Sequence, residues 1–293
     1  MDYNLCDSKT INRLLSAHGF KFSKALGQNF IVDEEVCPAM AKALCANKKT
    51  LVIEIGPGIG VLTKELCRVA GRVCAIELDK RLYPLLGETL GDYKNFELVE
   101  GDVMKLDLKK LIEEKSRGFT SVKICANLPY YITSPVIMLL LESRLPVDEI
   151  IVMVQREAAD RLCAEAGTRN SGAVSAAVQY YGSSEILFDV GRESFMPSPK
   201  VDSAVIKITP YTEPKYSVKD EKAFFTLVKA AFSQRRKTAV NSVSATLKIP
   251  KERVASALRE LSLDENIRAE KLTMEDFAAL SETLVEPQKA NEG

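Results

Sequence analysis

An apolar segment that runs into a glycine-rich loop constrains the fold of this chain more than any other feature. Residues 51–55 (LVIEI) have the composition of a buried strand, and residues 56–60 (GPGIG) follow as a loop. Val61, Leu62 and Leu66 then repeat with a helical period. Strand, glycine loop and helix in this order predict an α/β sheet whose loop lets a ligand lie against bare backbone at a helix N-terminus. A glycine turn without a ligand is the alternative interpretation.

The spacing of the glycines limits what that ligand can be. Glycine stands at the first, third and fifth positions of the loop. The dinucleotide fingerprint instead has its third glycine at the sixth position of the motif. The loop therefore argues against a nicotinamide or flavin dinucleotide as the ligand.

Acidic residues follow the next two predicted strands. Glu77 ends the strand at residues 72–76 and stands twenty-one residues after Gly56. Acidic residues at that distance commonly accept hydrogen bonds from ribose hydroxyls. Asp102 follows the strand at residues 96–99 and can accept a hydrogen bond from the amino group of an adenine. Ordinary turn chemistry explains Asp102 equally well when it is taken alone.

A fourth predicted strand, residues 122–126, ends in the turn Asn127-Leu128-Pro129-Tyr130. The Asn127 side-chain oxygen and the Leu128 carbonyl offer two acceptors to a planar amino group, while Pro129 has no N–H and a fixed φ. Tyr130 can stack on a base, an interaction worth roughly 1–3 kcal/mol. The exocyclic nitrogen of adenine is a poor nucleophile until acceptors hold both of its N–H bonds, so the turn predicts a nucleobase amine as the substrate. The alternative is a plain proline turn with a half-buried tyrosine.

The four strands together predict an open α/β sheet. In such a sheet the ligand lies outside the carboxyl ends of the strands, so Gly56, Glu77, Asp102 and Asn127 should converge at one edge. We therefore expect a single site at that edge.

Together these motifs resemble the methionine-site and adenine-site motifs of S-adenosylmethionine-dependent methyltransferases that act on amino groups. Three further segments narrow the resemblance to the rRNA adenine dimethyltransferase family: residues 26–30 (LGQNF), 195–203 (FMPSPKVDS) and 231–237 (AFSQRRK). The match runs from about residue 20 to 245. Residues 155–158 (QREA) and 195–203 favour the small-subunit rRNA branch, associated with kasugamycin sensitivity. The alternatives are the macrolide-resistance enzymes, which modify large-subunit rRNA, and the adenine-specific DNA methyltransferases.

The resemblance implies a fold and a reaction. The fold is a Rossmann-like class I methyltransferase sheet of seven strands, the last antiparallel, with a small all-helical C-terminal domain. The cofactor is S-adenosylmethionine, and two methyl groups go to N6 of each of two adjacent adenosines near the 3′ end of small-subunit (16S) rRNA in a pre-ribosomal 30S particle. An assembly factor that acts mainly by binding is the alternative from a different class.

The resemblance also implies the residues of the site. Those expected to contact the cofactor are Gln28, Asn29, Ile31, Gly56, Gly58, Glu77, Asp102, Val103 and Asn127. Those expected to hold and stack the target base are Asn127, Leu128, Pro129, Tyr130 and Phe195.

A basic segment predicts where RNA binds. The formal net charge is +0, so attraction to RNA has to come from a local patch. Residues 222–251 contain no acidic residue, and Arg235, Arg236 and Lys237 follow a predicted amphipathic helix there. Favourable interaction with the helix dipole is the alternative explanation for these three. Lys21 and Lys24 are expected to extend the patch near the site, with solvated loop lysines as the alternative.

Composition argues against several other kinds of site. The chain has one histidine, His18, and no paired cysteine spacing. These facts exclude a zinc deaminase and disfavour a Ser-His-Asp triad, and we expect no metal ion. The sequence has no basic leader and no apolar run near 18 residues, so we expect a cytoplasmic monomer without a membrane segment. The seven scattered cysteines are expected to be reduced thiols.

A domain boundary is predicted at residues 210–217, where a strand gives way to prolines and charged residues. Residues 1–210 form the expected methyltransferase domain, with a helical segment at about residues 1–48. Residues 211–293 form the expected helical C-terminal domain, which contacts RNA and the ribosome. Residues 273–276 (TMED) predict a capping box at the start of its last helix.

Overall fold

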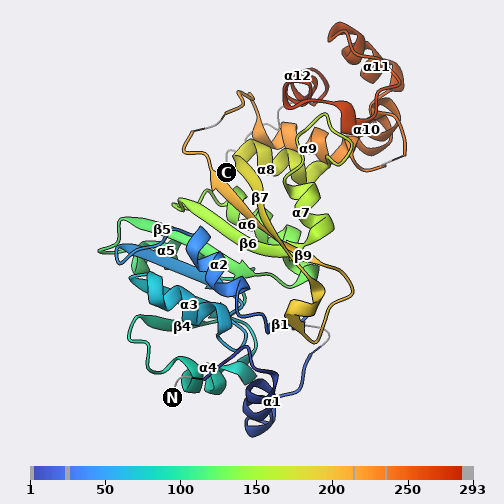
Figure 1. The fold of residues 1–293 in the computed structure, drawn as a ribbon. Coiled ribbons are helices and arrows are strands. Elements are labelled where there is room, and N and C mark those ends of the chain that lie inside the picture. Colours follow the sequence, from blue (N-terminus) through green and yellow to red (C-terminus); the bar gives the residue numbers. More distant parts are fainter. Residues whose placement is uncertain (1–2, 24–26, 214, 235, 286–293) are drawn as a thin grey trace. The chain divides into compact units, whose positions relative to one another are not determined.

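A computed structural model gives the fold of the chain (Figure 1). The described residues are 3–23, 27–213, 215–234 and 236–285. Two compact units divide the chain: unit 1 comprises Met1–Ala159 and Ser184–Pro210, and unit 2 comprises Asp160–Ser183 and Tyr211–Gly293.

One break between the units falls at the position predicted for the domain boundary, after Pro210. Residues 160–183, however, group with the C-terminal helices and not with the segments that flank them in sequence. A pattern read along the chain cannot assign them in this way, because compactness depends on contacts between residues that are distant in sequence. The division into two independent domains at residue 210 stays a prediction.

Unit 1 is built on a twisted mixed sheet with the strand order β4-β3-β2-β5-β6-β9-β7. Its strands are β2 (Thr50–Ile55), β3 (Arg72–Glu77), β4 (Phe96–Glu100), β5 (Ser121–Asn127), β6 (Glu149–Gln155), β7 (Gly182–Val190) and β9 (Ser203–Pro210). Strands β2 to β6 pair in parallel, whereas β9 runs antiparallel to β6. The predicted seven-stranded sheet with its last strand antiparallel is confirmed.

Helices precede, connect and follow the parallel strands. They are α2 (Val36–Ala43), α3 (Val61–Val69), α4 (Tyr83–Leu90), α5 (Leu108–Lys115), α6 (Thr133–Glu142) and α7 (Arg156–Leu162), with short 3-10 helices η2 (Lys80–Leu82), η3 (Tyr130–Ile132) and η4 (Arg192–Ser194). Leu62 and Leu66 of α3 lie in one buried cluster with Val52 and Val73 of the sheet. The apolar residues, spaced at a helical period, therefore form the side of α3 that packs against β2 and β3.

The predicted strand at residues 51–55 is fully buried within β2. A parallel strand covered on both faces needs a continuous apolar run, and the sequence supplies it apart from Glu54. The register pairs Ile55 with Ile76 and with Ala126. This pairing brings the carboxyl ends of β2, β3 and β5 to one edge of the sheet.

A second, two-stranded sheet joins distant parts of unit 1. Strand β1 (Phe30–Ile31) pairs antiparallel with β8 (Phe195–Met196), and Ile31 lies opposite Phe195. Helix α1 (Ser8–Ala17) precedes β1. The N-terminal segment predicted as helical therefore contains α1 and α2 but is interrupted by this strand.

Unit 2 contains a group of helices: α8 (Ala173–Tyr181), α9 (Glu221–Ala231), α10 (Ala239–Leu247), α11 (Lys251–Glu260), η5 (Ala269–Lys271) and α12 (Met274–Leu284). Tyr180 of α8 stacks on Phe224 of α9 with the ring centroids 5.2 Å apart. Thr273 and Asp276 form the predicted capping box of α12, each side chain bonding the other residue's backbone N–H. The predicted helical character of the C-terminal segment is confirmed.

Among the described residues, no helix has the length and the apolar character that crossing a membrane requires.

Candidate active site

A cavity of about 130 Å³ lies at the carboxyl edge of the sheet in unit 1. Every residue predicted to contact a cofactor or the target base lines it. They are Gln28, Asn29, Ile31, Gly56, Gly58, Glu77, Asp102, Val103, Asn127, Leu128, Pro129, Tyr130 and Phe195. The strand ends that were expected to converge do so, and the β1–β8 pair brings its own residues to the same place.

The glycine loop gives the cavity a wall of bare backbone. Gly56 has a φ of +72°, a conformation that side chains with a Cβ rarely adopt. A Cβ built on Gly56 would meet no heavy atom within 4 Å. Glycine is therefore needed for its backbone conformation, and the space beside it is open for a ligand. Gly58, in contrast, is tightly packed, since a Cβ built on it would lie 3.3 Å from the Phe30 ring.

Glu77 sits at the end of β3 with 6% of its surface exposed. Its Oε1 accepts a hydrogen bond from the Asp79 N–H over 2.7 Å, and the Gly58 N–H lies 3.4 Å from Oε2. Burial raises the pKa of Glu77, and the bonds from these backbone N–H groups oppose the shift. The carboxylate is thus fixed in position at the mouth of the glycine loop.

Glu54, inside β2, is a cavity-lining carboxyl that the sequence did not single out as functional. It is 1% exposed, and its Oε2 has no hydrogen-bond partner among the described residues. Burial raises the pKa of Glu54 to about 8; the nearby Thr63 hydroxyl opposes the shift and the charge of Glu77 adds to it. Thr63 Oγ1 nonetheless makes no hydrogen bond of ordinary geometry among the described residues. The sequence did contain a signal for Glu54, because it is the one acidic residue that interrupts the apolar run of this strand.

Asn127 is held by the N-terminal segment. Its Nδ2 donates to the Asn29 carbonyl over 3.5 Å, and no described residue donates to its Oδ1. The Leu128 N–H donates to the Met153 carbonyl over 3.1 Å, which ties the turn to β6. Asn127 therefore lines the cavity with an amide oxygen that accepts no hydrogen bond from the described residues.

Tyr130 and Phe195 supply the aromatic surfaces. The Tyr130 hydroxyl lies 2.9 Å from Ser203 Oγ, and burial raises the pKa of Tyr130. Phe195 is 4% exposed and packs in β8 opposite Ile31. Tyr131, next in the chain, is 55% exposed and also lines the cavity. Tyr130 is thus half-buried and held in place, while the ring of Phe195 is almost covered by protein.

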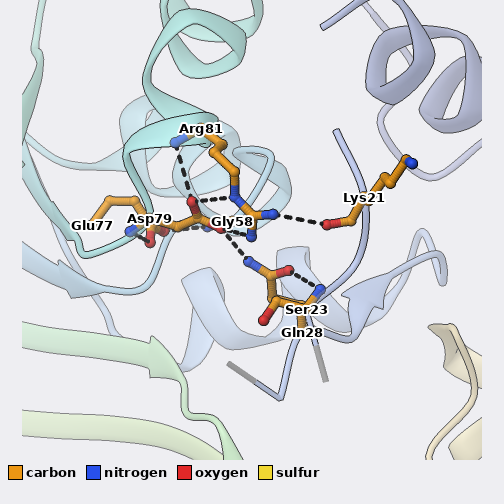
Figure 2. A network of polar contacts seen from close by, with 7 residues as sticks. All are labelled: Lys21, Ser23, Gln28, Gly58, Glu77, Asp79 and Arg81. Carbon is orange, nitrogen blue, oxygen red and sulfur yellow. Dashed lines mark hydrogen bonds and ion pairs between the residues drawn. The ribbon is translucent and has the colours of Figure 1, made fainter. Parts of the chain in front are cut away.

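Gln28 lines the cavity, but its side-chain amide is already engaged. Its Nε2 donates to Asp79 Oδ2 over 2.8 Å, and its Oε1 accepts from the Ser23 N–H over 2.9 Å (Figure 2). Asp79 in turn pairs with Arg81. Sequence reasoning missed Asp79 and Arg81, since charged residues after a strand end are common and no local pattern links them to Gln28.

The residues predicted to bind RNA fall in both units. Lys21 is exposed in unit 1, whereas Arg236 and Lys237 are exposed in the turn after α9 in unit 2. Lys24 and Arg235 lie outside the described residues. Helix α9 ends at Ala231, so Arg236 and Lys237 stand beyond the last turn, where the helix dipole has little effect. The dipole therefore does not explain these two cations.

Nothing in the described ranges groups three or more His, Cys, Asp or Glu side chains so that they could hold a metal ion. The single histidine, His18, contacts Glu88 with Nε2 2.7 Å from Oε2. It is not part of the cavity lining.

The chain is similar to known proteins over most of its length. A family model described as ribosomal RNA adenine dimethylase matches residues 19–286. A protein of Geobacillus sp. (strain WCH70), named ribosomal RNA small subunit methyltransferase A, is 43% identical over 287 residues, covering 97% of this chain and 99% of its own length. A protein of the same name from Alkaliphilus oremlandii (strain OhILAs) is 46% identical over 277 residues, covering 94% and 96%.

Solved structures are similar as well. A dimethyladenosine transferase from Plasmodium falciparum superposes with a TM-score of 0.70 at 26% identity, covering 86% of this chain and 95% of that chain. The 23S rRNA methyltransferase ErmE superposes with a TM-score of 0.65 at 24% identity, covering 88% and 100%. The second likeness supports the fold alone.

Proposed function

The chain belongs to the ribosomal RNA adenine dimethylase family, and we propose that it transfers methyl groups from S-adenosylmethionine to N6 of two adjacent adenosines near the 3′ end of small-subunit rRNA. Each adenosine receives two methyl groups. The observation that carries the proposal is the convergence of the glycine loop, Glu77, Asp102 and the turn that begins at Asn127 on one cavity. The proposed cofactor wall and the proposed base-binding turn thus line one cavity.

The cavity fits the chemical groups of S-adenosylmethionine. The open backbone at Gly56 leaves room for the methionine part. Glu77 and Asp102 line the cavity and would offer their carboxylates to ribose hydroxyls and to an adenine amino group. The buried Glu54 oxygen, without a partner among the described residues, suits a cationic group nearby. Asn29, Gly56, Glu77 and Asp102 would therefore hold the cofactor.

The bound cofactor supplies a methyl group already activated by a positive sulfur. The chain then needs to align a nitrogen nucleophile, and it needs neither a metal nor a strong base. The Asn127 oxygen and the Leu128 carbonyl would accept the two N–H bonds of the adenine amine. Tyr130, held by Ser203, would stack on the base. The proton that nitrogen loses can pass to water.

Two alternatives are less well supported. The relatives that are 43% and 46% identical carry the name of a small-subunit enzyme, whereas the large-subunit enzyme ErmE shares only the fold at 24% identity. A pure assembly factor would not need both a turn of acceptors and a carboxylate at the ribose position. Within the proposal, the substrate is a pre-ribosomal 30S particle in the cytoplasm and the enzyme acts as a monomer.

The test is transfer of labelled methyl from S-adenosylmethionine to undermethylated small subunits, large subunits and duplex DNA, followed by digestion to nucleosides. We expect dimethyladenosine from small subunits alone. Label in large subunits would favour the resistance-type alternative. Binding of the cofactor without label in any substrate would favour the assembly factor.

A further inference from the structure

The Asp79 carboxylate joins two parts of unit 1 that lie far apart in sequence (Figure 2). Arg81 binds it with two nitrogens, Nε over 2.8 Å to Oδ1 and Nη2 over 2.6 Å to Oδ2. Gln28 Nε2 donates to Oδ2 over 2.8 Å. Asp79 is 7% exposed, so these bonds satisfy a carboxylate that is largely removed from water.

Arg81 also reaches the segment that precedes Gln28. Its Nη1 donates to the Lys21 carbonyl over 3.2 Å, and its guanidinium carbon lies 4.9 Å from the centroid of the Phe20 ring. The Ser23 N–H closes the network on Gln28 Oε1. The Asp79–Arg81 pair thus holds the N-terminal segment at several points on both sides of residues 24–26.

The network ends at two walls of the cavity. On one side the Asp79 N–H donates to Glu77 Oε1. On the other side Gln28 is followed by Asn29, whose carbonyl accepts from Asn127 Nδ2. Neither Asp79 nor Arg81 lines the cavity. The Asp79 carboxylate therefore fixes Gln28, which precedes the residue that anchors the base-binding amide, while the Asp79 backbone N–H bonds the proposed ribose-side acid.

We propose that Asp79 and Arg81 are positioning residues for cofactor binding, whose side chains act by holding Gln28 and the segment before it in place without touching the cofactor. Gln28 shares this role, because both polar atoms of its side chain are used within the protein. The inference rests on the proposed function, since it takes the cavity to bind S-adenosylmethionine. A contribution to folding stability alone is the competing explanation.

The substitution Asp79→Asn separates these explanations. Asparagine can replace aspartate as the capping residue and keeps the backbone N–H that bonds Glu77, while the charge that binds Arg81 and Gln28 is lost. The matched control is Asp107→Asn, which alters the capping residue of α5 away from the cavity lining. Calorimetry measures the affinity for S-adenosylmethionine. Methyl transfer to undermethylated small subunits gives kcat and KM, and thermal unfolding gives the stability.

We expect Asp79→Asn to raise both the Kd and the KM for S-adenosylmethionine on the order of tenfold, as for loss of a charge-assisted hydrogen bond. The kcat at saturating cofactor and the KM for small subunits should stay near those of the parent and of Asp107→Asn, while the melting temperature should fall modestly because a charge-assisted pair is lost. A role in stability alone would lower the melting temperature and leave KM in place. An unchanged Kd, or a loss confined to kcat, would overturn the inference.

A double-mutant cycle with Gln28→Ala tests whether the two residues act through one contact. If they do, the double variant Gln28→Ala/Asp79→Asn binds the cofactor no more weakly than the single variant with the lower cofactor affinity. Additive losses would show that Asp79 does not act through Gln28. If the parent protein binds no S-adenosylmethionine, the proposed function fails and the inference fails with it. If the parent binds S-adenosylmethionine and the variants bind it equally well, only the inference is overturned.

Discussion

The Tyr130 hydroxyl lies 2.9 Å from Ser203 Oγ, which ties the turn after β5 to the first residue of the antiparallel strand β9. Tyr130 lines the cavity with its ring while its polar end is bonded to the sheet. One hydrogen bond thus sets the orientation of the proposed stacking surface. The pairing also fits the strand order, which brings β9 beside β6, the strand that follows the turn.

Substitutions at Tyr130 should separate the contribution of its ring to methyl transfer from that of its hydroxyl. Tyr130→Phe keeps the aromatic face and should lower kcat/KM for small subunits less than tenfold, with Ser203→Ala as its matched control. Tyr130→Ala removes the stacking, worth roughly 1–3 kcal/mol, and should cost about tenfold to a hundredfold. Steady-state methyl transfer measures kcat/KM for all three variants. If Tyr130→Phe were as impaired as Tyr130→Ala, the hydroxyl and not the ring would be the important group.

Asn127→Ala should nearly abolish methyl transfer while cofactor affinity changes only a few-fold. The amide oxygen is the acceptor proposed to hold the adenine amine, and its Nδ2 bonds only the Asn29 carbonyl among the described residues. Removing one such aligned polar group commonly costs on the order of a hundredfold or more in kcat. Single-turnover transfer and calorimetry measure the two quantities. Near-normal turnover would remove Asn127 from the mechanism.

The sequence was sufficient to place the residues of the main sheet edge. Gly56, Glu77 and Asn127 come at the ends of largely apolar strands and Asp102 follows the half-buried strand β4, and parallel pairing then brings the strand ends together. Local patterns reach this far because strand and loop are adjacent in the chain.

The contacts that complete the site could not be predicted from local patterns. Ile31 lies opposite Phe195 and Gln28 bonds Asp79, and both pairs are distant in sequence. Residues 30–31 are too few to show a strand period, and a polar contact leaves no periodic signal at all. The resemblance named Phe195 and Ile31 as site residues, but only the structure shows that they face each other.

Glu77→Ala should weaken cofactor binding on the order of tenfold or more, because the buried carboxylate proposed to accept from ribose hydroxyls is lost. Glu77→Gln is the sharper companion, since it keeps the shape and the bond from the Asp79 N–H but removes the charge. We expect it to bind cofactor with intermediate affinity. Calorimetry with S-adenosylmethionine measures both variants. Parental affinity in Glu77→Ala would contradict the assignment.

Arg235→Ala combined with Arg236→Ala should weaken binding to small-subunit rRNA and flatten its salt dependence. Each lost phosphate contact lowers the slope of log Kd against log salt by about 1. Arg236 is exposed beyond the end of α9, where the helix dipole has little effect. Lys109→Ala with Lys110→Ala, two exposed lysines of α5, is a control with the same change in net charge. An unchanged slope would assign the arginines to folding.

Glu54 makes stability depend on pH with a sign opposite to that of most acids. Burial raises its pKa from 4.5 to about 8 in the folded protein, whereas the unfolded chain releases the proton near 4.5. Between these two values unfolding releases a proton, so the free energy of unfolding falls as the pH rises. Above about pH 8 both states are ionised, and Glu54 causes no further fall.

Glu54→Gln should remove this dependence, because glutamine is neutral at every pH. The stability of the parent relative to Glu54→Gln should therefore decrease from pH 6 to pH 8, by at most about 1.4 kcal/mol per pH unit. Urea unfolding of both proteins at the two pH values measures the difference, and groups that do not interact with Glu54 cancel because both proteins contain them. If the difference in stability stayed constant from pH 6 to pH 8, Glu54 would titrate outside this range and would be ionised in the folded protein at neutral pH. The carboxyl would then need a partner that its unpaired Oε2 does not have among the described residues.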